Sequence, residues 1–335
     1  MSTDSNVNNS GTMFINSEIS LPRIARFWLM LLFNIPSTIC SMCLVFHILI
    51  NRTQRQALHN HTILAILIFG LPIQFIDINF YLAFYHNGIV QPSTHSICLL
   101  WWFTDLCFYT GGIILMAWLA IERHIIIFHD RWLSTRSGRL LFHYLPLIIL
   151  VTYSLLFYII VIFFPPCEDT YDYTLPVCNA SPCYQSYGIF TMWELIVNGS
   201  IPIFLEGIAS VGLIIRVQVQ RRRLYQSAQW GKQRRMIIQL FLVSGLNMSF
   251  NLPIYFIPIL RLCGLPPDFG LQAELYFFFL GYFVIFLFPF ASLCQYPQLR
   301  KVIKTRIFQF MPRQARHTTI VIPLAMKATP MNKPA

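Results

Sequence analysis

Seven long apolar stretches dominate this sequence of 335 residues. They run from Phe27 to Ile50, Thr62 to Tyr85, Ser96 to Ile121, Leu140 to Phe164, Tyr187 to Ile215, Met236 to Leu260 and Leu271 to Cys294. A helix needs about 20 mostly apolar residues to cross a bilayer, because the hydrocarbon core is about 30 Å thick and each residue rises about 1.5 Å. The strands of a membrane barrel are far shorter and alternate in polarity, so that class is excluded. The pattern predicts an all-α membrane protein, a bundle of seven transmembrane helices.

The composition excludes an ordinary soluble domain. Hydrophobic residues make up 56% of the chain and charged residues only 11%, whereas about 25% of the residues of an average soluble domain are charged. The net charge of +11 would suggest nucleic-acid binding in a soluble protein, but in a membrane protein the distribution of charge matters more than its sum. We therefore expect no nucleic-acid partner.

Lysine and arginine are distributed very unevenly between the two sides of the bundle. The segments after the first, third, fifth and seventh stretches hold 21 of the 24 basic residues. Basic loops stay in the cytoplasm, which places the C-terminus inside and the N-terminus outside. Asn8 and Asn179 are then glycosylation sites on the outer face. We expect a multi-pass protein of the plasma membrane.

The same reasoning divides the chain into four parts. Residues 1–26 form an extracellular segment and residues 27–297 the seven-helix domain. Residues 298–311 form an amphipathic basic helix on the anionic inner leaflet, because apolar residues recur there at helical spacing among Arg300, Lys301, Lys304 and Arg306. Residues 312–335 are a short polar tail that we expect to be disordered.

Four cysteines lie on the predicted outer side. Cys98 begins the third stretch, and Cys167, Cys178 and Cys183 crowd the loop before the fifth. Four cysteines allow three pairings, and the sequence does not choose among them. We expect one disulfide to join the loop to the third helix, Cys98 with Cys178 or Cys183.

The third stretch carries a charged residue near each end. Asp105 lies about 10 Å below Cys98, at about 1.5 Å per residue. Arg123 follows 18 residues later, which is about five helical turns, so we expect both to share one face. Intramembrane charges are costly and therefore mark functional candidates.

These features together resemble the rhodopsin-like family of G-protein-coupled receptors. Glu122-Arg123-His124 resembles the family's Asp-Arg-Tyr triplet, 25 residues after an outer cysteine. Pro202, Pro253 and Pro289 fall where the family's fifth, sixth and seventh spans carry prolines. The likeness covers roughly residues 27–310. It implies a receptor that binds an extracellular ligand, moves its sixth helix outward and activates a heterotrimeric G protein through Glu122, Arg123 and His124, with Pro253 and Pro289 in the moving helices.

The sequence also departs from the family pattern. Gly70 stands where the second span usually has a sodium-binding Asp, and Asn251 replaces the Trp of the sixth span. The inner end of the sixth span, residues 232–236, contains no acid that would hold Arg123. We therefore predict that Glu122 alone pairs with Arg123 at rest, with measurable basal signalling.

The outer half of the bundle holds the candidate ligand site. Asp105 occupies the position at which amine receptors bind an ammonium group, and Tyr282 matches the tyrosine that bonds it. The predicted ligand-binding residues are Asp105, Tyr109, Glu194, Asn198, Asn251 and Tyr282. They suit a small cationic ligand, although Tyr109 or Tyr282 would also satisfy the acids internally.

An alternative function uses the intramembrane acids Asp77, Asp105, Glu194 and Glu206 as the path of a channel or transporter. An enzyme is not expected, and neither is a metal or cofactor. Retinal needs a Schiff-base lysine in the seventh span, and all five lysines lie in predicted cytoplasmic segments: Lys232, Lys301, Lys304, Lys327 and Lys333.

Overall fold

The computed structural model describes residues 19–178, 182–219, 230–297, 299–300 and 305. The predicted glycosylation sites Asn8 and Asn179 lie outside the described residues, as does the tail 312–335. Only Leu299, Arg300 and Thr305 of the predicted 298–311 helix are described. Residues from Tyr296 onward belong to a separate unit, and everything below concerns the unit that ends at Gln295.

The seven predicted helices are confirmed, each long and apolar enough to cross a membrane. The first is α2 (Arg23–Ile50), and the second (Leu58–Asn87) contains α4 (His61–Pro72) and α5 (Ile78–Asn87). The third (His95–Phe128) contains α6 (His95–Trp102) and α7 (Tyr109–Phe128), and the fourth (Arg136–Phe163) contains α9 (Arg136–Arg139) and α10 (Leu145–Phe163). The fifth (Gly188–Val219) contains α11 (Gly188–Trp193) and α12 (Ile201–Val219), the sixth lies in α14 (Trp230–Leu262), and the seventh is α15 (Leu271–Leu293). Two short helices, α3 (Arg52–Arg55) and α8 (Asp130–Ser134), follow the first and third.

π-helical segments interrupt the second to fifth helices at Ile73–Asp77, Phe103–Phe108, Leu140–Tyr144 and Glu194–Ser200. A π-helical turn holds more residues than an α-helical turn and shifts the helical register. The count of five regular turns between Asp105 and Arg123 therefore does not hold, because Phe103–Phe108 contains Asp105. Both side chains are nevertheless buried within the protein.

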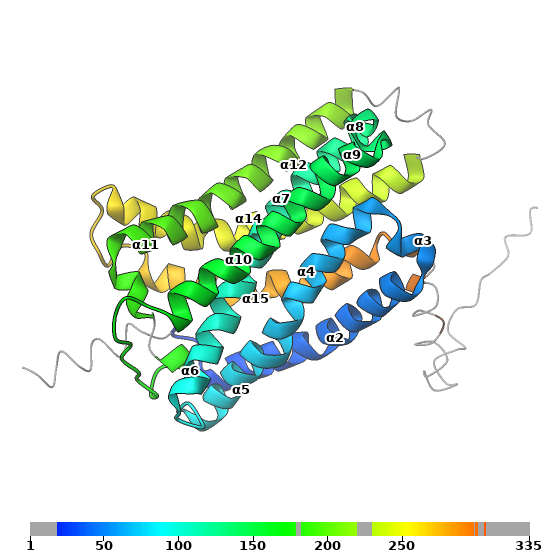
Figure 1. Cartoon of the computed structure of the whole chain (residues 1–335). Coiled ribbons are helices and arrows are strands. Elements are labelled where there is room, and N and C mark those ends of the chain that lie inside the picture. The colour runs from blue at the N-terminus through cyan, green and yellow to red at the C-terminus, as the bar shows by residue number, and fades with distance from the viewer. Residues whose placement is uncertain (1–18, 179–181, 220–229, 298, 301–304, 306–335) are drawn as a thin grey trace, which may run out of the picture. The chain divides into compact units, whose positions relative to one another are not determined.

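The third helix is the centre of the bundle. α7 packs against α4, α10, α12 and α14, while α2 packs against α5 and α15 (Figure 1). In the most apolar part of the third helix 56% of the residues are buried, against 22% in the fourth. The fourth helix therefore lies at the periphery, and side chains on α7 contact most of the other helices.

The bundle has two distinct ends (Figure 1). The short helices α3, α8 and α9 lie at one, which we call the Arg123 end because α7 finishes there. The α5–α6 connection and α11 lie at the other, which we call the disulfide end because it contains the cystines.

Candidate functional site

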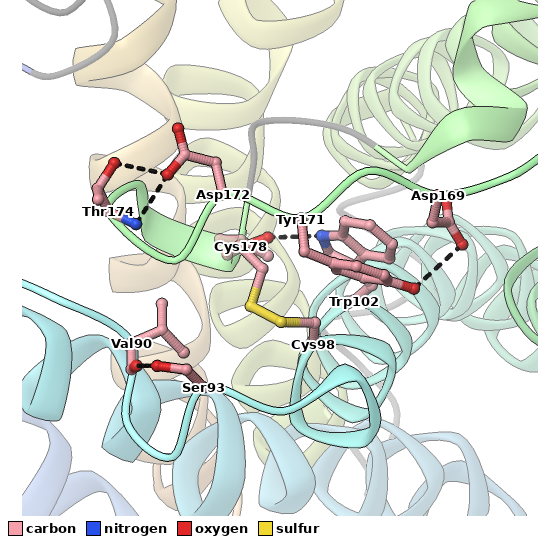
Figure 2. The surroundings of a disulfide bond; sticks show 10 residues. Val90, Ser93, Cys98, Trp102, Asp169, Tyr171, Asp172, Thr174 and Cys178 are labelled. Atoms are coloured by element: carbon pink, nitrogen blue, oxygen red, sulfur yellow. Dashed lines mark hydrogen bonds between the residues drawn. A yellow bond between two sulfur atoms is a disulfide. The ribbon is translucent and has the colours of Figure 1, made fainter.

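The loop between α10 and α11 is fastened to the third helix. Cys98 is bonded to Cys178, so the structure resolves the choice that the sequence left open. Figure 2 shows this bond beside Trp102, whose indole N–H donates to the carbonyl of Val177 at 2.6 Å. The same loop accepts a hydrogen bond from the backbone of Val90 on the carbonyl of Tyr173. The loop is thus tied to the third helix and to the connection between α5 and α6.

A second disulfide, Cys167–Cys183, closes the loop on itself. Asp169 accepts the backbone N–H of Cys183, and the ring of Tyr171 stacks on Trp102 with 5.2 Å between centroids (Figure 2). Burial and the neighbouring Asp169 raise the pKa of Tyr171, so its phenol stays protonated. The loop therefore forms a packed cover over the disulfide end.

Asp105 and Tyr282 meet beneath this cover. Asp105 is 5% exposed, and its carboxylate accepts a hydrogen bond from the Tyr282 hydroxyl at 2.7 Å. The sequence placed these two residues at one site, and the structure brings them together. Since Tyr282 already satisfies one carboxylate oxygen, an incoming cation must share Asp105 with this tyrosine or displace it.

A second buried acid lies close by. One oxygen of Asp77 accepts the indole N–H of Trp101 at 2.7 Å, and Oδ2 has no hydrogen-bond partner among the described residues. The ring of Tyr81 makes edge-to-face contacts with Trp101 at 5.1 Å and with Tyr282 at 5.5 Å. Asp77 and Asp105 thus belong to one aromatic cluster, a neighbourhood that the sequence did not indicate.

Glu194 and Asn198 form a separate polar group. Tyr158, Tyr184 and Gln185 donate to the two oxygens of Glu194 at 3.1, 3.0 and 2.9 Å. Asn198 accepts from the hydroxyl of Tyr153 at 2.6 Å. Because these partners lie on α10 and in the covering loop, the two residues connect the fifth helix to the fourth, and their acceptors are already occupied.

Tyr109 and Asn251 begin a continuous polar chain through the bundle interior. The Tyr109 hydroxyl donates to Asn251, the Asn251 amide donates to Asn247, and the Asn247 amide donates to Glu206. The Ser244 hydroxyl donates to the other oxygen of Glu206 at 2.8 Å and lies 2.6 Å from the Ser210 hydroxyl. The chain joins α7, α14 and α12. The sequence analysis named Glu206 as an intramembrane acid but not its partners on α14.

A glycine on α15 makes room for the start of this chain. A Cβ at Gly281 would collide with the Tyr109 hydroxyl and lie 2.9 Å from Oδ1 of Asn251. Only a residue without a side chain lets α15 approach the Tyr109–Asn251 pair so closely. Tyr109 and Tyr282 are in ring contact at 5.7 Å, which places the chain next to the Asp105 pair.

A small cavity of about 30 Å³ lies on the Arg123 side of Tyr109 and Asn251, room for one or two water molecules. Gly70 and Pro289 line it, together with residues of α2, α4, α7 and α14. No acidic side chain is among its lining residues. The position at which the rhodopsin-like family usually has a sodium-binding Asp is occupied here by Gly70. Pro253 lies inside α14 and Pro289 inside α15.

Glu122 makes a contact that differs from the prediction. Its carboxylate lies 2.6 Å from Nδ1 of His143 on the fourth helix, an ion-pair distance at an angle outside the hydrogen-bond range. Arg123 is fully buried and donates to the backbone carbonyl of His59 at 3.0 Å. The described contacts of Glu122 and Arg123 are with different neighbours, and their expected pairing at rest stays a prediction. Successive residues on a helix point in directions about 100° apart, so Glu122 turns toward the π-helical segment Leu140–Tyr144 and Arg123 toward the segment before α4.

His124 connects the third helix to the fifth. Its Nε2 lies 2.8 Å from the Arg216 guanidinium, which also lies 4.6 Å above the ring of Phe128. Because an arginine only donates hydrogen bonds, Nε2 of His124 must accept. The Glu122-Arg123-His124 triplet thus contacts three different neighbours around the end of α7.

The four π-helical segments hold three acidic residues that the sequence analysis named and one histidine, His143, that it did not. Each of the four carries a buried or hydrogen-bonded polar side chain: Asp77, Asp105, His143 and Glu194. π-helical turns in α-helices frequently occur at functional sites. The signal available for His143 was a histidine inside an apolar stretch, three positions before Pro146.

Comparisons with known proteins define the class to which the fold belongs. No family model matches the sequence, and no curated protein matches it either. Among solved structures the chain is similar to squid rhodopsin, with a TM-score of 0.63 and 13% sequence identity over 86% of this chain and 87% of that chain. At this identity the likeness shows the fold alone. The chain is a multi-pass membrane protein with the rhodopsin-like seven-helix fold.

Proposed function

We propose that the protein is a receptor of the plasma membrane that binds an extracellular ligand at the disulfide end and activates a heterotrimeric G protein at the Arg123 end. The fold is consistent with this function, and the uneven distribution of basic residues places the Arg123 end in the cytoplasm. Membrane lipids surround the bundle.

The polar chain from Tyr109 to Ser210 is the observation that carries this proposal. It starts beside the Asp105–Tyr282 pair and passes through Asn251 to Glu206 on α12. A ligand that alters the packing of Tyr282 or Tyr109 acts directly on the hydrogen bonds between α7, α12 and α14. A receptor needs such a physical link, because a ligand shifts an equilibrium only by its different affinity for the two states.

The ligand class that we propose is a small amine. Asp105 is a buried carboxylate among aromatic rings, and both features favour an ammonium group. Asp105 has a protein partner at present, so binding of the amine would compete with the Tyr282 hydroxyl. Glu194 is less suited to bind it, because three donors already occupy its carboxylate.

The channel or transporter alternative gains no support from the arrangement of the acids. Asp77, Asp105, Glu194 and Glu206 each accept hydrogen bonds from neighbouring side chains. Glu194 and Glu206, both on the fifth helix, bond different sets of neighbours, and neither set includes the Trp101 and Tyr282 partners of Asp77 and Asp105.

The experiment that tests the proposal is a screen of amines in cells that report several G-protein pathways. An active compound should lose its effect on Asp105→Asn and keep it on Asp268→Asn, the matched change of an exposed acid at the same end. Arg123→Ala should abolish the G-protein signal while surface expression is retained. An agonist that acts equally on Asp105→Asn would refute the amine site, and a response that persists in Arg123→Ala would refute G-protein coupling through this residue.

A further inference from the structure

Three exposed arginines lie on two neighbouring short helices at the Arg123 end. Arg131 is on α8, and Arg136 and Arg139 are on α9, which packs against α8 (Figure 1). Among the described residues, no hydrogen-bond or ion-pair partner meets any of the three guanidinium groups. Asp130 is the one acidic residue in positions 123–167. We call Arg131, Arg136 and Arg139 the arginine cluster, and its positive charge exceeds that of the nearby acid in the sequence.

The backbone that carries the cluster is held in one arrangement. The hydroxyl of Ser134 donates to the carbonyl of Arg131 at 2.7 Å, and the hydroxyl of Thr135 accepts the backbone N–H of Gly138 at 3.0 Å. A Cβ at Gly138 would lie 1.8 Å from the backbone oxygen of Trp132, so a residue with a side chain would collide there. Glycine therefore lets α9 pack closely against α8.

Large apolar side chains are exposed next to the cluster. Trp132 is 48% exposed and stacks on the ring of Phe142 with 5.1 Å between centroids. Leu140 and Leu141, which follow Arg139 directly, are 60% and 54% exposed. Tryptophan is enriched where a membrane meets water, with its ring at the level of the lipid headgroups. The segment thus presents charge and apolar surface side by side.

The position of the cluster on the fourth helix matches the headgroup layer of a bilayer. This helix runs from Arg136 to Phe163, and its apolar part begins at Leu140. Arg139 directly precedes this apolar part, and Arg136 lies about 6 Å before it at about 1.5 Å per residue. The headgroup layer is about 5–8 Å thick on each side of the hydrocarbon core. The guanidinium groups are therefore at the level of the lipid phosphates.

We propose that the arginine cluster binds the phosphate groups of anionic membrane lipids, whose acyl chains lie against the exposed leucines at the start of the fourth helix. A guanidinium group donates two parallel hydrogen bonds to a phosphate, so arginine suits this headgroup. A soluble anion would leave Leu140 and Leu141 without apolar contact, whereas a lipid covers both kinds of surface. The distribution of basic residues places this end at the cytoplasmic leaflet, which is the leaflet rich in anionic lipids.

The test measures lipid binding to the purified full chain in a neutral detergent by native mass spectrometry. The probe is short-chain phosphatidylinositol phosphate. Phosphatidylcholine with the same chains is the comparison for the headgroup, and inositol phosphate is the same headgroup without chains. The wild type should bind the inositol lipid more tightly than either comparison compound.

Two variants remove the site in different ways. One basic residue strengthens binding to an anionic membrane surface about fivefold, so Arg136→Gln with Arg139→Gln should weaken binding of the inositol lipid about thirtyfold. Gly138→Ala keeps the charge but should also weaken binding, because its methyl group meets the carbonyl of Trp132 and displaces α9. The control is Arg52→Gln with Arg55→Gln, which removes the same charge from exposed arginines of α3 at the same end.

The control pair should bind the inositol lipid as the wild type does. Equal weakening in the two arginine pairs would overturn the proposal, because diffuse charge would then account for the binding. Phosphatidylcholine or free inositol phosphate that binds as tightly as the inositol lipid would also overturn it, and so would unchanged binding in Gly138→Ala. The assay contains no agonist and no G protein, so its result is independent of the proposed receptor function.

Discussion

Ser244→Ala is the sharpest test of the polar chain between the fifth and sixth helices. The Ser244 hydroxyl is buried, donates to Glu206 and contacts Ser210. If the sixth helix moves outward in the active state, as in the proposed receptor function, the Ser244–Glu206 bond must break. Its loss in the variant then destabilises the resting state alone, and basal G-protein signalling should increase.

The size of the increase follows from the strength of such bonds. Interhelical hydrogen bonds in membranes contribute about 0.6 kcal/mol on average and at most about 1.7 kcal/mol. These free energies correspond to a shift of about threefold to about twentyfold in the equilibrium between two states. The contact with Ser210 adds to this effect, whereas Asn247 still donates to Glu206 and keeps part of the link.

The control is Ser249→Ala on the same helix. Ser249 is exposed, and its hydroxyl donates to the carbonyl of Gly245 one turn before it. Second-messenger output without agonist, divided by surface expression, should rise for Ser244→Ala and remain near the wild-type level for Ser249→Ala. Equal output from the two variants would refute the inference that Glu206 holds the sixth helix.

Two further predictions concern stability of the purified chain. Gly281→Ala should lower the free energy of unfolding by about 1–3 kcal/mol, because its methyl group meets Tyr109 and Asn251. Gly245→Ala, where the space is open, should have no such cost, and a Gly281→Ala protein as stable as the wild type would argue against close packing there. Cys178→Ser should lower the free energy of unfolding more than Cys183→Ser does. The first variant loses the Cys98–Cys178 disulfide, which spans 80 residues, and the second loses Cys167–Cys183, which spans 16. The chain-entropy model gives roughly 4.5 and roughly 3 kcal/mol for them, and the reverse order in denaturant unfolding would contradict it.

Comparing the predicted and observed helix ends shows where the apolar pattern of the sequence predicts helix boundaries and where it does not. The seventh helix was predicted to within one residue, because its apolar run stops at clear polar borders. The third helix extends to Phe128 instead of ending at Ile121, since Glu122, Arg123 and His124 continue the helix while contacting protein partners. Hydropathy measures how strongly a segment prefers lipid to water. It therefore does not predict that polar side chains continue a helix when they find hydrogen-bond partners inside the bundle.

The candidate site was predicted in part. The resemblance to amine receptors implied that Asp105 and Tyr282 meet, and the two side chains are hydrogen-bonded in the structure. The partner of Glu122 did not follow, because His143 lies in a π-helical segment whose register the sequence does not display. Nothing in the order of residues indicated that Glu206 bonds Ser244 and Asn247 on another helix.

By itself the sequence determined that the chain has seven helices long and apolar enough to cross a membrane, because the thickness of the hydrocarbon core sets the length that each apolar segment needs. The sequence also indicated two possible partners for Cys98, namely Cys178 and Cys183, and it indicated which acidic residues lie within the membrane-spanning segments. Only the tertiary structure decided which groups satisfy those acids, since a hydrogen bond depends on approach and direction between atoms that lie 9 to 177 positions apart in the chain. The same dependence on direction brought Glu122 to His143 and Arg123 to the carbonyl of His59.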